Sequence, residues 1–378
     1  MTFYNAASPI NIADTYGEWQ VVEFLIKMPT GRQMKAGSLR LNGKLQVKKT
    51  LAGGTPQPIL GNEGVMLNQY CGVHSFFRNS NTTINNRTIE SLQNYPRYVA
   101  MMAQHDATPE GVLTSSAHAS ELKGCLNTFL LAGNSSKGIS FSMKPHVCLN
   151  KTSAPLPQSK FQEMKVMFQL GSGLESLYIV DPGTDIQALS FEFTDLQLSW
   201  MEQPEEKGLS AIPTIFNCIS NMVQTITGLN SNIQVVSSTA YDALSMSFIR
   251  QNQQRSINKD ALLCEYVPDI NRVEFLVNGG DAPLAYALQP PLYQDVALNY
   301  YNSLSSSGAV IWKTTTGRTN SIMNRFLSEN GCFGVGMRFS SSINDKLQVA
   351  LTIDDNTDYN PSDAPIDCFI YVNSFLSL

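Results

Sequence analysis

Several stretches of the chain alternate apolar and polar residues with a period of two, the pattern of a strand with one buried face. The clearest runs from Ser38 to Lys49, where leucines and a valine occupy one face and polar residues the other. Segments 333–339 and 347–353 repeat the pattern. Because one face of each strand is polar, we expect antiparallel sheets that bury a single side, and therefore an all-β protein.

Other segments extend this prediction to most of the chain. In one of them Phe191 and Phe193 share a face, whereas Leu196, Leu198 and Trp200 follow out of phase. This shift predicts a β-bulge or a bend between the two groups. Further strands are predicted at Glu18–Lys27, Gly138–Met143, Met164–Leu170, Ile233–Ser237, Leu244–Arg250, Val273–Asn278 and Cys368–Phe375. Long polar connections, typical of jelly-roll sandwiches in which strands cross between two sheets, are predicted at Asn79–Arg87, Asn150–Gln158 and Asp354–Asp363.

Helical patterns are few. Tyr95–Gln104 and Gln294–Leu304 are predicted as short helices. Apolar residues between Ile215 and Ile226 also have helical spacing, although the β-branched residues among them and Pro213 before them disfavour a helix.

The order of features repeats along the chain. A predicted strand at His74–Phe77 leads through an Asn-rich turn to a helical segment near Tyr95. Val273–Phe275 leads through Asn278–Asp281 to a similar segment at Tyr300. The repeat, about 200 residues long, fits one domain. Two all-β units in tandem are therefore expected, with Glu202–Gly208 as the boundary and domains at 1–203 and 204–378.

The chain carries little charge for its length. Asp, Glu, Lys and Arg make up 15% of the 378 residues, against about 25% in typical domains. Little repulsion between copies suits a protein that packs at high density, although secreted adhesins share this bias. The net charge is −5, and Met1–Asp14 contains no Lys or Arg, so nucleic acid is not expected as a direct partner.

No motif predicts catalysis, and no catalytic, cofactor-binding or metal-binding residues are assigned. The four histidines form no HExxH motif, and His105–Asp106 is interpreted as a helix end. Gly171–Gly173 is interpreted as a turn between strands, and the glycines at 331, 334 and 336 as points of close backbone approach. The acidic segment Asp354–Asp363 favours a solvated loop over a calcium site, with a structural ion at a subunit contact left open.

The seven cysteines are odd in number and far apart in sequence. This disfavours both a disulfide framework and a zinc site, and predicts buried free thiols in a reducing compartment. No apolar run approaches the length of about 20 residues that a membrane-spanning helix needs.

Aromatic residues recur beside the polar loops. They can form a sugar-binding surface or pack in the core and at interfaces, and the enrichment of aromatics at interfaces favours packing. The residues concerned are Tyr70, Phe76, Phe77, Tyr95, Tyr98, Tyr293, Tyr300 and Tyr301.

A family resemblance rests on the order of several short motifs. Asn68-Gln-Tyr-Cys-Gly-Val-His-Ser-Phe-Phe, followed by Asn85-Asn86 and Tyr95-Pro-Arg-Tyr, resembles the first roll of double jelly-roll major capsid proteins of the adenovirus, tailless-phage and polinton-like virus lineage. Met143-Lys-Pro-His-Val-Cys-Leu-Asn and the closing Leu196-Gln-Leu-Ser-Trp are similar to later parts of that roll. Arg272-Val-Glu-Phe-Leu-Val-Asn resembles the matching point of the second roll.

The resemblance implies two tandem eight-stranded jelly-roll β-sandwiches with a few short helices in loops. It implies a non-enzymatic virion protein, without cofactors, that forms pseudo-hexameric homotrimers. These would tile an icosahedral capsid assembled inside the host cell. The implied partners are other copies and penton or minor capsid proteins, with an internal membrane possible nearby and no sequence-specific nucleic acid binding. A carbohydrate-binding adhesin, a minor penton-like capsid protein and a β-sandwich hydrolase remain alternatives.

Overall fold

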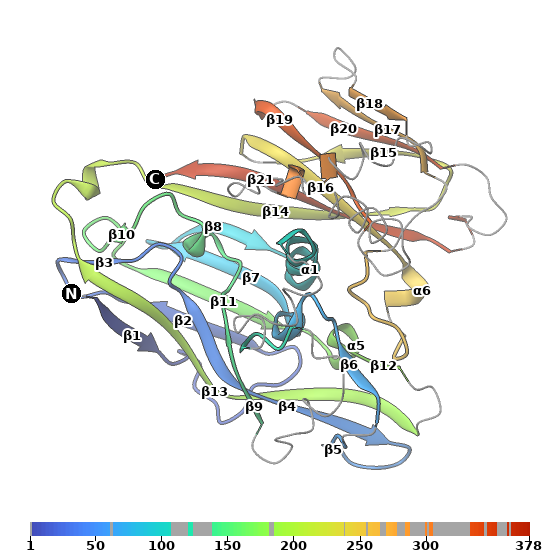
Figure 1. The fold of residues 1–378 in the computed structure, drawn as a ribbon, viewed down its shortest axis with the longest axis horizontal. Coiled ribbons are helices and arrows are strands. Elements are labelled where there is room, and N and C mark those ends of the chain that lie inside the picture. The colour runs from blue at the N-terminus through green and yellow to red at the C-terminus, as the bar shows by residue number, and fades with distance from the viewer. Residues whose placement is uncertain are drawn as a thin grey trace, which may run out of the picture. The chain divides into compact units, whose positions relative to one another are not determined.

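The structure is a computed structural model. It describes residues 2–60, 63–106, 120–123, 138–180, 185–237, 239–254, 256–264, 270–277, 284–287, 299–300, 302–304, 333–343, 346–353, 361–362 and 364–378. Two compact units are distinguished (Figure 1). The first comprises Met1–Ile219, Arg255–Leu262 and Leu376–Leu378, and the second comprises Ser220–Gln254 and Leu263–Phe375. The boundary expected between residues 203 and 204 stays a prediction.

Two antiparallel sheets form the first unit. One has the strand order β1 (Phe3–Ala7), β13 (Ile186–Pro204), β4 (Arg40–Leu51) and β9 (Ile139–Met143), and is extended by β3 (Arg32–Met34), β5 (Gln57–Pro58) and β10 (Leu156–Pro157). The other has the order β2 (Val21–Ile26), β11 (Met164–Leu170), β7 (Phe77–Ile84) and β8 (Arg87–Leu92). A small ribbon pairs β6 (Val65–Leu67) with β12 (Leu177–Ile179).

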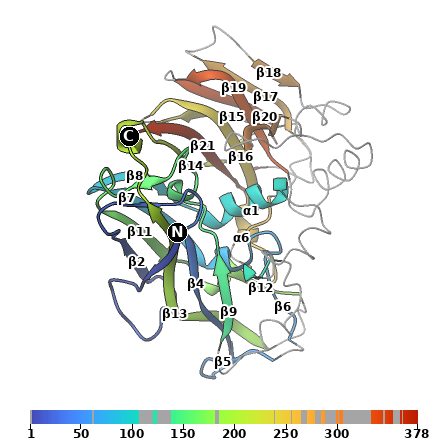
Figure 2. The ribbon, with the colours of Figure 1, turned by 60° about the vertical axis from the view of Figure 1, so that its left-hand side comes forward.

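The second unit also consists of two sheets, which Figure 2 shows from another side. One has the order β14 (Ile215–Ile226), β21 (Ile366–Ser377), β16 (Tyr241–Arg250) and β19 (Val335–Ile343). The other has the order β15 (Asn230–Val235), β20 (Leu347–Ile353), β17 (Ile270–Val277) and β18 (Leu284–Ala287).

Both units have the same strand permutation. When the eight main strands of a unit are counted in chain order, one sheet runs first, eighth, third, sixth and the other second, seventh, fourth, fifth. This is the Greek-key arrangement of a jelly roll. The expected all-β fold of two tandem eight-stranded jelly rolls is confirmed.

Phenylalanines from both sheets fill the core of the first roll. The Phe76 ring lies 4.5 Å from that of Phe191, and the Phe77 ring lies 5.2 Å from both Phe168 and Phe193, between ring centroids. All five side chains are at most 1% exposed. Because aromatic pairs contribute about 0.5–1.5 kcal/mol each beyond the buried area, this cluster holds the two sheets together.

The predicted β-bulge lies in β13. The pairing of β13 with β4 shifts between Thr194 and Gln197, and Asp195 has a left-handed φ of 54°. An extra residue here moves the following side chains by one position, so Leu196 and Leu198 face the core as Phe193 does before them. The phase shift in the sequence is therefore confirmed as a bulge.

Helices occupy the connections, as expected. In the part of the chain that the structure describes they include α1 (Tyr95–Asp106), α5 (Gly173–Ser176), α6 (Gln251–Gln254) and the 3₁₀ turns η1 (Gly72–Phe76), η2 (Cys148–Asn150) and η3 (Leu209–Ala211). Of the segment predicted at Gln294–Leu304, residues 299–300 and 302–304 are helical and the others lie outside the described residues. His105–Asp106 ends α1, as predicted.

Glycines of the second unit admit two side chains from that helical segment. A Cβ atom at Gly334 would lie 2.2 Å from the Tyr300 ring, and one at Gly336 would lie 2.2 Å from the Ser303 hydroxyl. The prediction of close approach is confirmed at both positions, and Gly331 lies outside the described residues.

The helical spacing between Ile215 and Ile226 was misleading, because this segment is strand β14. Residues 216–219 are all buried, so neither strand alternation nor a polar face is visible there. Phe216 bridges to Thr152 and its ring packs 5.5 Å from Phe161. Burial on both faces, together with the strand preference of β-branched residues, explains the error.

The predictions for three short segments were also wrong. His74 to Phe76 belong to η1, and β7 begins only at Phe77. The expected polar loop Asn79–Arg87 is mostly the β7–β8 hairpin, which turns at Asn85 and Asn86 with φ values of 47° and 63°. Asparagine tolerates this left-handed conformation, so two residues suffice for the turn. Ser172, expected in a turn between strands, instead caps α5.

Candidate functional site

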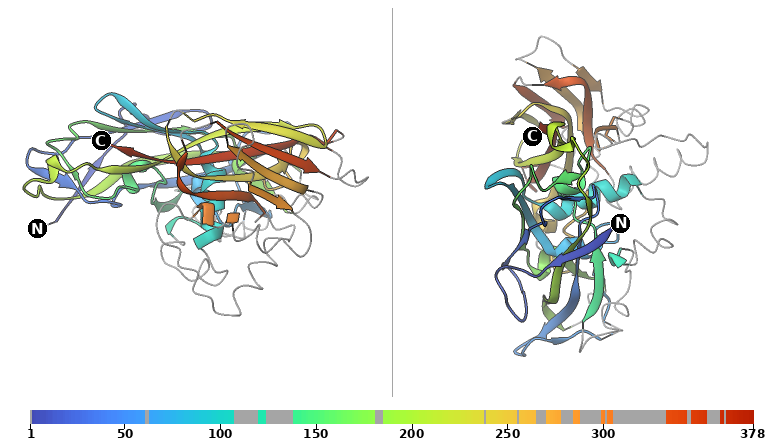
Figure 3. Two further views of the ribbon diagram at one scale, coloured as in Figure 1. Left: turned by 90° about the horizontal axis from the view of Figure 1, so that it is seen from above. Right: turned by 90° about the vertical axis from the view of Figure 1, so that its left-hand side faces the viewer.

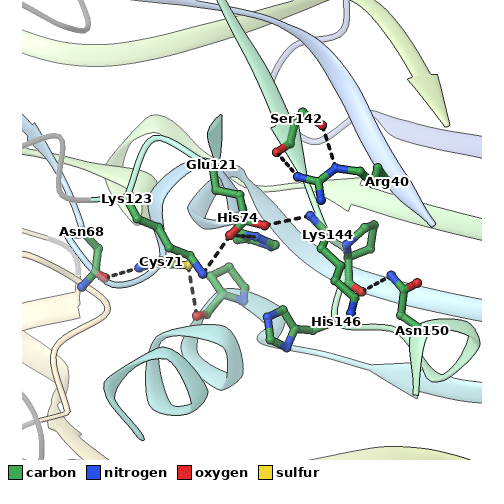
Figure 4. Close-up of polar contacts among 12 residues, drawn as sticks. Arg40, Asn68, Cys71, His74, Glu121, Lys123, Ser142, Lys144, His146 and Asn150 are labelled. Atoms are coloured by element: carbon green, nitrogen blue, oxygen red, sulfur yellow. Dashed lines mark hydrogen bonds and ion pairs between the residues drawn. The ribbon is translucent and has the colours of Figure 1, made fainter. Parts of the chain in front are cut away.

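A buried group of polar side chains lies at one end of the first roll. It consists of His74 from η1, Tyr95 at the start of α1, Glu121 and Lys123 from the segment 120–123, and His146 after β9. We call these five residues the polar cluster, and Figure 4 shows its environment. Four separate parts of the chain meet here, none of which shares a strand with another.

His74 and Tyr95 form the centre of the polar cluster. The Tyr95 hydroxyl lies 2.8 Å from Nδ1 of His74 and accepts a hydrogen bond of 3.1 Å from the His146 backbone N–H. An ionised carboxylate can only accept, so Glu121 places the single ring proton of neutral His74 on Nε2, and Nδ1 accepts from the Tyr95 hydroxyl. Nε2 faces the Glu121 carboxylate at 3.5 Å. The network thus fixes one tautomer of His74.

Glu121 is clamped by several partners. Lys123 Nζ lies 2.9 Å from its carboxylate, and the backbone N–H of Lys144 donates to the carboxylate at 2.9 Å. Its own carbonyl accepts a 2.8 Å hydrogen bond from the Val73 N–H. The approach is so close that a Cβ atom at Gly72, which has a φ of 57°, would lie 2.3 Å from the Glu121 carbonyl oxygen. Glycine is required at this position.

Burial determines the protonation of the histidines. Burial lowers the pKa of His74 below its usual value, and it lowers that of His146 further, with the charges of His74, Lys151 and Lys123 acting in the same direction. Burial alone would raise the pKa of Glu121, but hydrogen bonding to His74 and the charge of Lys123 lower it. The polar cluster therefore combines an ionised Glu121 carboxylate with neutral imidazoles at neutral pH.

A second buried carboxylate lies nearby. Glu90 accepts hydrogen bonds from the backbone N–H groups of Cys148 at 2.7 Å and Ile219 at 2.9 Å. Burial raises its pKa, which the charge of Lys151 partly offsets. Lys151 in turn donates to the Tyr98 hydroxyl at 3.1 Å. These bonds attach η2 and the start of β14 to strand β8.

The geometry favours a structural role for both groups over an acid–base site. A catalytic base must reach a proton of its substrate, whereas His74 is 0% exposed and both its nitrogens face protein groups. Within the described ranges, no three His, Cys, Asp or Glu residues are grouped so that they could hold a metal ion. Hydrogen-bonded buried networks of this kind rigidify the connections that they join.

Several predicted features can be placed. Cys71, Cys148, Cys218, Cys264 and Cys368 are buried free thiols, as expected. The packing interpretation of the aromatic residues is confirmed for six of them, which are at most 7% exposed: Tyr70, Phe76, Phe77, Tyr95, Tyr98 and Tyr300. Cys125, Cys332, His118, Tyr293, Tyr301 and most of Asp354–Asp363 lie outside the described residues. Among the helices that are described, none has the length and apolar character to cross a membrane.

The chain is similar to known proteins in its fold and not in its sequence. No family model matches the sequence, and no curated protein matches it. The fold is similar to the Faustovirus major capsid protein, with a TM-score of 0.62 and 8% identity over 100% of this chain and 90% of that one. The PBCV-1 virus capsid is similar with a TM-score of 0.61 and 11% identity, over 100% of this chain and 94% of that one. The mavirus major capsid protein is similar with a TM-score of 0.52 and 13% identity, over 99% of this chain and 90% of that one. The chain thus has the double jelly-roll fold of these capsid proteins.

Proposed function

We propose that the chain is a major capsid protein whose copies form trimers of pseudo-hexameric outline that tile an icosahedral shell. The observation that carries the proposal is the presence, in one chain, of two rolls with the same strand permutation. Three such chains present six similar rolls, so a closed threefold assembly acquires a nearly sixfold outline. An object with that outline can tile a flat facet.

The interior of the first roll supports a packing role. Its core is aromatic and apolar, and its polar groups fix connections instead of facing a substrate. The low content of charged residues, 15%, keeps repulsion between neighbouring copies small. Weak lateral contacts repeated over many identical copies then sum to a stable shell. The proposed role needs no catalytic residue and no cofactor.

The alternatives have less support. A sugar-binding adhesin needs exposed aromatic side chains, whereas six of the residues that suggested it are buried. A minor, penton-like capsid protein generally needs only one roll. A hydrolase needs ionisable groups that converge on an open site, and the polar cluster is closed around His74.

The remaining proposals follow from this role. The partners are other copies of the chain and the proteins at capsid vertices, and the location is the virion. We propose residues 1–203 and 204–378 as the two jelly-roll domains. Contact with nucleic acid would be indirect, because the net charge of −5 gives no excess of cations for phosphates.

Size-exclusion chromatography with light scattering tests the proposal. We expect a species of three times the 41.6 kDa subunit mass, and roughly hexagonal particles in negatively stained images. A monomer that persists at all concentrations and binds glycans on an array would contradict the capsid role and favour the adhesin.

A further inference from the structure

Two of the buried free thiols are in contact with each other. Cys148 lies in η2 and Cys218 lies in β14, 70 positions later in the chain, and both belong to the first unit. A hydrogen bond joins their side chains. We call these two residues the thiol pair. Two adjacent sulfur atoms can do one thing that other buried side chains cannot, which is to form a covalent bond.

Backbone hydrogen bonds hold the two segments beside each other. The Asn217 N–H donates to the Lys151 carbonyl at 3.1 Å, and Thr152 and Phe216 form an antiparallel bridge. The turn η2, in which the Lys151 N–H donates to the Cys148 carbonyl at 2.9 Å, brings Cys148 close to the same pairing. Opposite residues in an antiparallel pairing have Cβ atoms about 4.5–5.5 Å apart, and a disulfide needs about 3.5–4.5 Å. Segments joined in this way lie at a separation that a disulfide can span.

One carboxylate holds the backbone next to both thiols. Glu90 accepts a hydrogen bond from the Cys148 N–H through one oxygen and from the Ile219 N–H through the other. Ile219 directly follows Cys218 in β14. Because the same side chain positions the backbone at both cysteines, the sulfur atoms can join without a large movement of either segment.

The residue before β14 pairs with the end of the chain, which is marked C in Figure 3. The Thr214 N–H donates to the Leu378 carbonyl at 2.9 Å, and the Leu378 N–H donates to the Thr214 carbonyl at 3.1 Å. Cys218 follows four positions later, and the chain enters the second unit at Ser220. A covalent bond at Cys218 therefore attaches β14 to the first roll just before the chain leaves that unit.

The surroundings keep the thiol pair reduced until an oxidant reaches it. Cys148 is 0% exposed and Cys218 is 5% exposed. Burial raises the pKa of the Cys148 thiol, and the hydrogen bond with Cys218 acts in the same direction. Because the thiolate and not the thiol is the reactive form, the pair reacts only when local opening admits solvent. The reaction begins at Cys218, which is the more accessible of the two.

We propose that Cys148 and Cys218 form a disulfide when the chain leaves a reducing compartment and meets a low-molecular-weight disulfide such as oxidised glutathione. The Cys218 thiolate displaces one glutathione thiolate and forms a mixed disulfide. The Cys148 thiolate then attacks the Cys218 sulfur, and the second glutathione thiolate leaves. The two protein thiols give up two protons and two electrons, which convert one molecule of oxidised glutathione into two molecules of reduced glutathione.

The disulfide stabilises the first roll. It closes a long loop, which restricts the unfolded chain more than a short loop does, and it fixes the start of β14 against η2. The biological use of the bond rests on the proposed capsid function, because a capsid protein is made in a reducing cell interior and its virion then meets an oxidising exterior. The bond itself forms within one chain and does not depend on assembly.

The test treats the purified full-length chain with oxidised glutathione, blocks the remaining thiols with iodoacetamide in denaturant and digests the protein without reductant. We expect mass spectrometry to find a cross-linked pair of peptides that contains Cys148 and Cys218 and that separates on reduction. Free thiols at both positions after prolonged treatment, glutathione adducts without a bridge, or a bridge to another cysteine would each overturn the inference.

Thermal unfolding gives a second readout, in which each variant is compared with its own reduced form. Oxidation should raise the Tm of wild type by about 5 °C or more, because the closed loop lowers the entropy of the unfolded chain. Cys218→Ser should show no such shift. The matched control Cys368→Ser removes a buried cysteine outside the thiol pair and should keep the full shift. An equal shift in wild type and Cys218→Ser would contradict the inference.

The two proposals fail in different ways. If Cys218→Ser does not fold, the peptide analysis of wild type decides the question alone. Trimers that form while both thiols stay free under oxidation would overturn the disulfide and leave the capsid function standing. A bridged chain that never forms trimers or shells would support the disulfide and contradict the capsid function.

Discussion

The side-chain amide of Asn68 donates a hydrogen bond of 2.7 Å to the Asp260 carboxylate, although the two residues are 192 positions apart. Asp260 lies in the segment 256–262, which follows β16 and α6 in sequence yet belongs to the first unit. Asn68 also accepts hydrogen bonds from the N–H groups of Tyr70 and Cys71 at 3.0 and 2.8 Å. One amide thus orders the entry to η1 and anchors a distant segment.

Replacing Asn68 with Ala should lower the free energy of unfolding by about 2–3 kcal/mol, because a buried carboxylate and two N–H groups lose their partner. Urea denaturation measures the change. Asn232→Ala, at an exposed position of β15, is the control and should stay within about 0.5 kcal/mol of wild type. Equal effects of the two substitutions would contradict the anchoring role.

Gly72→Ala should destabilise the protein by about 3 kcal/mol or more. The added Cβ atom would combine left-handed strain with a clash against the Glu121 carbonyl oxygen. Gly208→Ala is the matched control, because Gly208 has a φ of 82° but nothing within 4 Å of the added atom. It should lose only about 1 kcal/mol, from strain alone. Thermal unfolding of both variants checks the difference, and similar losses would mean that segment 120–123 is not fixed against η1.

Acid should weaken the fold through His74. Because burial holds the pKa of His74 below its usual value of 6.5, the unfolded chain binds a proton at higher pH than the folded chain. The stability that neutral His74 provides is present above pH 6.5 and is lost as pH falls below it. The groups that face the ring are Tyr95, Glu121, Lys123 and His146.

A difference measurement isolates this effect. Burial raises the pKa values of Glu90 and Asp260, and these groups gain stability as pH falls. They contribute equally to wild type and to His74→Gln, so their effect cancels in the comparison. Between pH 7.5 and 5, the unfolding free energy of wild type should fall more steeply than that of His74→Gln. Parallel curves would show that folding does not shift the pKa of His74, and would contradict the burial effect.

The aromatic core gives a fourth prediction. Phe193→Ala should lower the unfolding free energy by about 3–5 kcal/mol, because Phe193 is 0% exposed and contacts rings from both sheets. Phe375→Ala, at a side chain that is 42% exposed, should change it by about 1 kcal/mol or less. Calorimetry distinguishes the two, and a small effect of Phe193→Ala would contradict the packing described for the first roll.

Strands with one polar face could be predicted from the sequence. Ser38–Lys49 corresponds to β4, Met164–Leu170 to β11, and the phase shift after Phe193 to the bulge at Asp195. In each case a local pattern records which face is buried. The segment from Ile215 to Ile226 failed because four consecutive residues are buried, so no pattern recorded its strand character.

The polar cluster could not be predicted. His74 and His146 are 72 positions apart, and Glu121 and Lys123 lie in a stretch with no periodic pattern. Their association depends on long-range contacts that no spacing in the sequence encodes. One usable signal was Gly72, two positions before His74. A glycine at the start of a buried turn indicates that another segment of backbone lies close to it.

Cryo-electron microscopy of the purified assembly tests the central claim most directly. The account predicts a trimer in which six jelly rolls, two from each chain, surround a threefold axis with a nearly hexagonal outline. A single roll per chain, or an isolated subunit with an open cleft lined by ionisable side chains, would contradict it.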